Sequence, residues 1–253
     1  LVIDTGGWFR IGCPTSQIAK PEITGAIYRI RRDGAHSTTD PRGQELAWDE
    51  IRTKPSELAS LLDDSRPAVR QRAVEVAAVA MEQETLDGTA LFELVYHDDS
   101  EMRHLNYLWA LARTSDPNGA ISQYAETALS TKLVTATYNV AAITGAADAE
   151  ILIEAGIHWE ELAKVRSAIE GTWRLHLVDD RPDLIEASIY SILQELRSGR
   201  FDRTTEHAAI HCLIRLARPE FTAPFLSDDS PAVRRAALIA LDQMEGGRLT
   251  REQ

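Results

Sequence analysis

Two segments that lie far apart in this chain have nearly the same sequence. Residues 61–73 read LLDDSRPAVRQRA, and residues 225–237 read FLSDDSPAVRRAA. In both, an apolar stretch leads into Asp-Asp-Ser, a proline and a Val-Arg pair that opens a long alanine-rich stretch. Internal similarity of this kind is typical of repeat proteins, in which one unit cannot bury its apolar face alone and therefore stacks on its neighbours.

The residues that the two segments share suit the junction between two helices. Asp and Ser ahead of a helix can accept hydrogen bonds from its first N–H groups, and a proline in the first turn loses no bond. The valine starts an apolar stripe, and the arginine one turn inside can reach the Asp of its own or the next unit. We interpret these residues as a structural signature and not as a catalytic dyad or a calcium site. They are Asp64, Pro67, Val69 and Arg70, and Asp229, Pro231, Val233 and Arg234.

Apolar residues recur at helical spacing from residue 55 onward, which predicts an all-α fold, an α-solenoid of about six helix pairs. Arg103 is placed as the counterpart of Arg70 in the next unit. Between residues 146 and 203 the signature is degenerate, and 159–176 can pair with either 147–156 or 182–198. The predicted helices span 55–62, 67–82, 87–96, 100–114, 118–130, 132–145, 147–156, 159–176, 182–198, 203–217, 219–227 and 231–244.

Charge and hydropathy exclude some classes of partner. The chain has 27 basic and 39 acidic residues and a formal net charge of −12, which argues against a surface that follows a phosphate backbone and so against nucleic acid. No apolar run approaches the ~20 residues of a membrane span. Of the two cysteines, Cys13 and Cys212, we expect Cys212 to be a buried free thiol.

The first 54 residues do not follow the repeat pattern. Residues 1–32 contain two short β-type runs, 1–3 and 26–31, and residues 33–54 are polar and read as a linker before a repeat array over 55–247. Two strands alone are marginally stable in water, so this segment is expected to need a larger sheet. We expect both ends of the chain to continue in a longer protein.

These segments together resemble a known protein organisation. The repeat core, D-x-x-P-x-V-R-x-x-A, resembles the HEAT-like repeat of the phycobilin-lyase type. Residues 4–32, DTGGWFRIGCPTSQIAKPEITGAIYRIRR, and residues 240–253, ALDQMEGGRLTREQ, resemble planctomycete-type membrane-bound dehydrogenases. In that family a sugar-dehydrogenase-like β-propeller is followed by HEAT-like repeats and by a c-type haem domain with a C-x-x-C-H motif. The resemblance implies that residues 1–32 are the closing strands of a truncated propeller.

The resemblance also sets expectations about cofactors and location. It implies that the parent protein carries haem c and a propeller-bound cofactor and is periplasmic or membrane-associated. This chain departs from the pattern, because nearly all of the propeller is missing and C-x-x-C-H does not occur. Cys13 is followed by Pro-Thr-Ser and cannot attach haem. We therefore expect no cofactor, no catalytic residue and no enzymatic activity in this chain itself.

Two sets of side chains are candidates for binding. His207 and His211 stand one helical turn apart, which is half of a zinc site, but no third or fourth ligand accompanies them, so no metal is expected. Large aromatic and arginine side chains fall on the second helices of the pairs, which line the concave face of HEAT-like arrays and often anchor interfaces. These candidates are Arg103, Tyr107, Trp109, Tyr138, Trp173 and Arg174.

The leading hypothesis is a non-catalytic scaffold module that positions the propeller and haem domains of an exported dehydrogenase, with the rest of that parent chain as its protein partner. In a second hypothesis residues 1–32 contribute to the dehydrogenase active site, with Trp8 or Arg10 near the cofactor. A third is a stand-alone HEAT-like lyase or DNA glycosylase. The acidic charge opposes the glycosylase, and the propeller-like sequence opposes both activities.

Overall fold

The computed structural model divides the chain into two compact units, Leu1–Asp40 and Pro41–Gln253. We treat each unit by itself. The residues that the structure describes are 2–4, 24–28, 30, 34, 38–115, 121, 124, 130–145, 149–178, 182–247 and 249.

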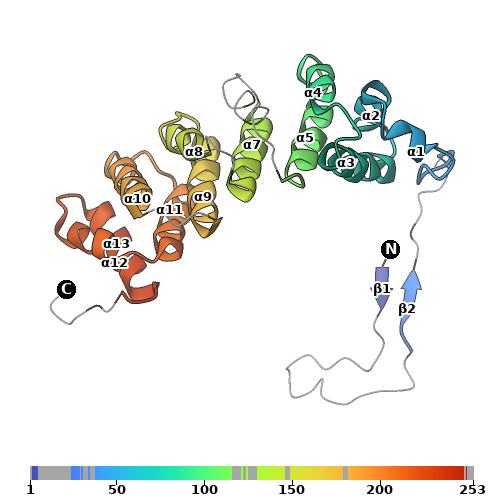
Figure 1. Ribbon diagram of the computed structural model, residues 1–253. Helices are drawn as coiled ribbons and strands as arrows, with labels where there is room; N and C mark the ends of the chain where they lie inside the picture. Colours follow the sequence, from blue (N-terminus) through green and yellow to red (C-terminus); the bar gives the residue numbers. More distant parts are fainter. Residues whose placement is uncertain are drawn as a thin grey trace. The chain divides into compact units, whose positions relative to one another are not determined.

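The first unit contains a pair of short antiparallel strands (Figure 1). Strand β1 (Val2–Asp4) pairs with β2 (Ala26–Tyr28), so that Val2 lies opposite Tyr28 and Ile3 opposite Ile27. These four apolar side chains are between 48% and 71% exposed. Trp8 and Phe9, which come between the two strands in the sequence, lie outside the described residues. The described strands therefore leave their apolar side chains open to solvent.

The second unit is built from helices. The predicted helices from 55 onward coincide with them, with ends that differ by a few residues. Of the predicted helix 118–130, only Ile121, Tyr124 and residue 130 are described. The helices are α1 (Trp48–Ile51), α2 (Pro55–Leu61), α3 (Pro67–Glu82), α4 (Gly88–Tyr96), α5 (Glu101–Leu111), α7 (Thr131–Thr144), α8 (Ala149–Ile157), α9 (Leu162–Val178), α10 (Pro182–Arg197), α11 (Arg203–Leu216), α12 (Pro219–Thr222), the 3₁₀ helix η2 (Ala223–Ser227) and α13 (Pro231–Gln243).

The segment just before α2 packs onto this unit. Trp48 and Ile51 in α1 are buried, and the Trp48 Nε1 donates to the Gly43 carbonyl at 2.7 Å. Gly43 has a φ of 65° and lies so close to Val69 that a Cβ there would stand 2.9 Å from the valine Cγ2. The residues from 41 to 54, within the stretch that the sequence predicts as a linker, thus form part of the helical unit.

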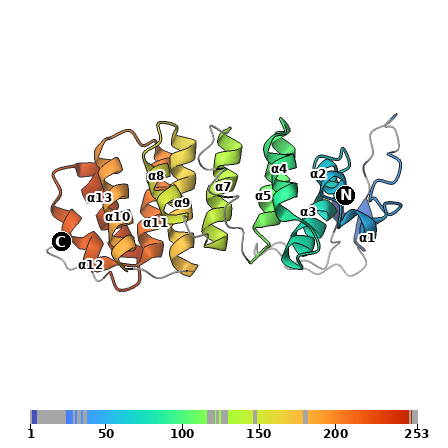
Figure 2. The same cartoon turned by 45° about the horizontal axis from the view of Figure 1, so that its top comes forward.

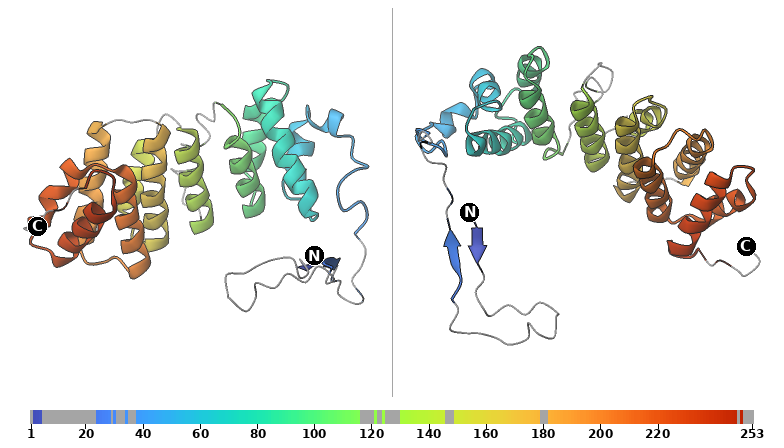
Figure 3. Two further views of the ribbon diagram at one scale, coloured as in Figure 1. Left: turned by 90° about the horizontal axis from the view of Figure 1, so that it is seen from below. Right: turned by 180° about the vertical axis from the view of Figure 1, so that it is seen from behind.

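The helices are arranged like those of a repeat protein (Figures 1 and 2). Helices α3, α5, α7, α9, α11 and α13 contact one another in this order, and α2 contacts α4 as α8 contacts α10 in a second row. Helix α9 packs far more extensively on α8 than on α10, which decides between the two open pairings in favour of 147–156 with 159–176. The views in Figure 3 agree with this order. None of the described helices combines the length and the apolar character that crossing a membrane requires.

The first signature segment forms its junction differently from the prediction. The Asp64 carboxylate accepts hydrogen bonds from the backbone N–H and from the guanidinium of Arg66, all at 2.8 Å. It makes no capping hydrogen bond to the first turn of α3, which begins at Pro67. Arg70 Nη1 donates to the Asp64 carbonyl at 2.6 Å, so the predicted Asp–Arg contact is within the unit and is made through the backbone.

The second signature segment repeats these contacts one residue earlier than we predicted. Asp228, and not Asp229, is the counterpart of Asp64, because its carboxylate accepts the Ser230 N–H at 2.9 Å. Arg234 Nη1 donates to the Asp228 carbonyl at 2.6 Å. The Asp228 carboxylate also pairs with Arg197 at the end of α10, so this junction is tied to α10.

A third copy of the junction replaces the arginine by a histidine. The Asp98 carboxylate accepts the Ser100 N–H at 2.8 Å, and the Asp98 carbonyl accepts from His104 Nε2 at 2.7 Å. His104 therefore stands where Arg70 does in the first unit, and Arg103 does not, because it pairs with the Asp98 carboxylate instead. The counterpart of Arg70 is therefore His104, one residue after the predicted Arg103.

Candidate functional site

Two of the predicted anchor residues lie in the core. Tyr107 is 2% exposed and packs against Phe92 and Tyr124, and Tyr138 is 4% exposed. Burial raises the pKa of the Tyr107 and Tyr138 hydroxyls above its usual value. The structure does not offer either ring to a partner.

Two further candidates lie on α5. The side chain of Arg103 is mostly buried and is held by the Asp98 carboxylate, so its role is to brace the turn before the helix. Trp109 is 38% exposed, and its carbonyl accepts a bond from Arg113. Of the two, only Trp109 presents a large apolar surface to solvent.

Trp173 and Arg174 belong to a group of aromatic and cationic side chains on α9 and α11. The guanidinium carbon of Arg174 lies 4.9 Å from the Trp173 ring centroid, and that of Arg215 lies 4.8 Å from it. The His211 ring meets the indole edge-on, with 5.7 Å between centroids. Cation–π contacts of this kind are attractive because the ring face is negative.

Helix α7 joins this group through Arg174. Arg174 Nη1 donates to the Asn139 Oδ1 at 3.4 Å and to the Glu170 carbonyl at 3.0 Å. The Glu170 carboxylate lies 3.9 Å from the same guanidinium in a partly exposed pair, which contributes little to stability. The six residues of this group on three neighbouring helices are called the Trp173 cluster: Asn139, Glu170, Trp173, Arg174, His211 and Arg215.

The pKa of His211 depends on burial and on the charges around the cluster. Its pKa lies below the usual value because of burial first, and then because of the positive charges of Arg215 and His207, while Glu170 acts in the opposite direction. Burial therefore contributes most to the lowered pKa, and the neighbouring positive charges add to it. Such a surface can bind carboxylates through its guanidinium groups and apolar side chains through its indole ring.

The surroundings of the histidine pair on α11 do not resemble a metal site. His207 and His211 are both exposed, and His211 faces Trp173. Within the described parts of the chain, no group of three or more His, Cys, Asp or Glu side chains is placed to hold a metal ion. The neighbouring Cys212 is buried, as predicted, and burial raises the pKa of its thiol to about 12, so it stays protonated at neutral pH.

Sequence reasoning selected Trp173 and Arg174 but missed Arg215 and the cross-helix role of His211. The only sequence signal that joins them is the repeat period, which places α9 and α11 as neighbouring second helices. That signal does not say which faces of the two helices meet.

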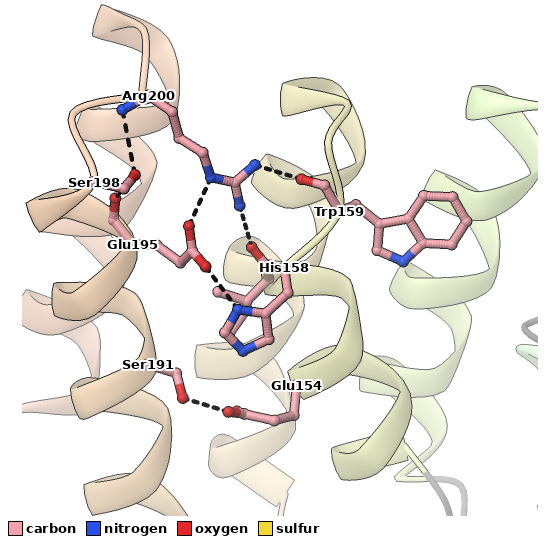
Figure 4. A network of polar contacts seen from close by, with 8 residues as sticks. Glu154, His158, Trp159, Ser191, Glu195, Ser198 and Arg200 are labelled. Carbon is pink, nitrogen blue, oxygen red and sulfur yellow. Dashed lines mark hydrogen bonds and ion pairs between the residues drawn. The ribbon is translucent and has the colours of Figure 1, made fainter.

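A separate polar network ties α8 to α10 (Figure 4). Arg200, just after α10, donates from Nη2 to the Ile157 carbonyl at 2.8 Å and from Nη1 to the Trp159 carbonyl, and so satisfies the C-terminal end of α8. Its Nε lies 2.6 Å from the Glu195 carboxylate, which also accepts from His158 Nδ1 at 2.7 Å. Burial raises the pKa of Glu195, but these two donors outweigh it and keep the pKa below its usual value.

This network is expected to act as a structural clamp. Replacing Arg200 by Ala removes the donors to two helix-end carbonyls and leaves Glu195 with His158 alone, so we expect a loss of ~1–2 kcal/mol in unfolding free energy. Urea denaturation followed by circular dichroism measures it. Arg203→Ala is the matched control, because the side chain of this exposed arginine at the start of α11 forms no hydrogen bond or ion pair with a described residue, and it should change little. Equal effects of the two substitutions would contradict the clamp.

A cavity of ≈470 Å³ lies beside the clamp, between α8, α9 and α10. Its walls are mainly apolar, with Ile153, Leu175 and Leu184 among them. The Glu154 and His158 side chains at its edge are already bonded to Ser191 and Glu195, so these polar groups serve the helix contact. The Trp173 cluster is therefore the better candidate for recognition.

In comparisons with known proteins, no family model matches the chain, and no curated protein matches it either.

Proposed function

We propose that this chain is a non-catalytic protein-interaction module. The observation that supports it is the Trp173 cluster, in which an indole and two guanidinium groups are held at the surface of neighbouring helices. Tryptophan and arginine are the residues that most often dominate binding energy at protein interfaces. Stacked helices suit this role, because each contacts only its neighbours and the stack presents an extended surface.

Hydrogen bonds and an ion pair between different helices hold the stack together. Thr135 on α7 bonds Ser167 on α9 at 3.0 Å, and Arg235 on α13 pairs with Glu206 on α11. Asn106 on α5 donates to the Leu62 carbonyl at 2.7 Å. A surface that is held in this way loses little conformational entropy on binding, which favours affinity.

We further propose that the module belongs to a larger exported dehydrogenase and positions its β-propeller and haem domain. The support is the resemblance of residues 4–32 to closing propeller strands, together with the exposed apolar side chains of β1 and β2. A two-stranded sheet with uncovered apolar faces gains stability when further strands extend and cover it. The partner is then the rest of the parent chain, and the adjoining reading frame tests this, because it should encode propeller strands upstream and C-x-x-C-H downstream.

Deleting residues 1–38 is expected to leave the helical unit folded with almost the same melting temperature. The physical reason is that the Gly43–Trp48 bond and the buried Ile51 lie beyond the deletion. The deletion should abolish association with a separately produced propeller that ends before Leu1. Circular dichroism and size-exclusion chromatography measure the two results.

Deleting residues 1–52 is the control, because it also removes Trp48 and Ile51 from the core, and it should lower the melting temperature. If the shorter deletion already unfolds the helices, β1 and β2 are part of their core. If the propeller still binds the shortened chain, the strands are not the point of attachment.

A further inference from the structure

The Trp173 cluster carries more positive than negative charge, whereas the chain as a whole is negatively charged. The chain has a formal net charge of −12, whereas the cluster holds two arginines against one carboxylate, that of Glu170. The positive charges of Arg215 and His207 also act on His211, after burial, in lowering its pKa. These positive charges favour an anion nearby, whereas burial disfavours charge of either sign, so the two arginines and not the pKa indicate a site for an anion.

Arg215 is the cationic group most open to a partner. It is exposed, it lies against the Trp173 ring, and it forms no ion pair with any described residue. Arg174, in contrast, already donates to Asn139 and to the Glu170 carbonyl. A guanidinium group that rests on an aromatic ring keeps its N–H edges free for a bidentate bond to a carboxylate.

Trp173 supplies the apolar half of the same surface. Its side chain is partly exposed, and its Nε1 is a buried donor without a hydrogen-bond partner among the described residues. A buried polar group without a partner is uncommon and costs free energy. Because the protein itself covers this atom, a partner would contact the exposed part of the ring and not its N–H.

We propose that the Trp173 cluster binds an acidic peptide segment of a protein partner. An Asp or Glu carboxylate of that segment bonds Arg215, and a neighbouring apolar or aromatic side chain packs on the exposed part of Trp173. An extended segment fits better than a small acid, because the cluster runs across α7, α9 and α11. This inference rests on the proposed function as an interaction module and adds the chemistry of the partner.

Selection from a library of random short peptides against the whole chain tests the inference. The recovered peptides should be enriched in Asp or Glu next to an apolar or aromatic residue. A labelled peptide from this set, followed by fluorescence anisotropy, should bind roughly tenfold more weakly to Arg215→Ala, because a charge pair against a ring is lost. Arg203→Ala removes the same charge from the same helix, at the far end from the cluster, and should change the affinity by less than about twofold.

The outcomes separate this inference from the proposed function. Enriched peptides without acidic residues, or equal weakening by the two arginine substitutions, overturn the acidic partner but leave an interaction module. A library that yields no enriched peptide also overturns the acidic peptide as the partner, whereas the interaction module itself is tested by its association with the propeller. Replacing Glu by Gln in the selected peptide gives a further check, because unchanged affinity of that peptide would also refute carboxylate recognition.

Discussion

Replacing Gly156 by Ala should destabilise the protein, although the same substitution stabilises most helices by about 1 kcal/mol. Gly156 lies in α8 where it crosses α9 and α7. A Cβ at this position would stand 2.7 Å from the Cβ of Ala168 and 2.8 Å from the ring of Tyr138. Because both neighbours are buried, the helices must move apart, and overpacking of this kind costs ~1–3 kcal/mol. We expect the steric term to exceed the gain in helix propensity.

Gly88→Ala is the matched control for this prediction. Gly88 is the first residue of α4, and the nearest side-chain atoms to a Cβ there belong to Met81 at 3.7 Å, an ordinary contact distance. This substitution should be neutral or slightly stabilising. Urea denaturation of both variants, followed by circular dichroism, measures the difference. If Gly156→Ala is as stable as Gly88→Ala, α8 does not approach its neighbours as closely as the structure has it.

Replacing His104 by Ala should cost about 3 kcal/mol, because one buried and one partly buried polar partner lose their bonds and a cavity is formed. His104 is 7% exposed, and its ring links the Asp98 carbonyl at 2.7 Å with the Tyr124 hydroxyl at 2.8 Å. The Tyr124 hydroxyl is deeply buried, and burial raises its pKa, so it cannot compensate by ionising. Denaturant unfolding should therefore show a lower midpoint for this variant.

His97→Ala is the control, since the ring of this exposed histidine bonds a single described residue, the exposed Glu93, at 3.2 Å. It should change the unfolding free energy little, because exposed pairs contribute little. His104→Gln, which retains an amide donor, should recover part of the loss. A His104→Ala variant as stable as His97→Ala would show that the junction at Asp98 does not depend on this ring.

The sequence predicted the local structure of this protein closely. Helix positions followed from apolar spacing and from prolines such as Pro67 and Pro231, which do begin α3 and α13. Both signals act within a few residues, so they are readable without knowing the rest of the fold. The same holds for Ala73 and Ala236, whose complete burial at the helix contacts was expected from their small size.

The junction chemistry was predicted in kind and misplaced by one residue. Sequence alignment chose Arg103 because it matches the residue type of Arg70, whereas the structure uses His104, which reaches the same carbonyl. A hydrogen bond to a carbonyl requires a donor at the right distance and not a particular residue. Residue type alone therefore selects the wrong counterpart of Arg70, because the position of the donor decides which residue reaches the carbonyl.

The candidate site was decided only by tertiary structure. Tyr107 and Tyr138 turn into the core while Trp173 stays partly exposed, and sequence periodicity treats the three alike. The partners of Trp173 are Arg215 and His211, which are brought to it by the packing of α11 on α9. How two helices rotate and slide against each other depends on every side chain in their contact, so the sequence determined the helices and only their packing determined which faces meet.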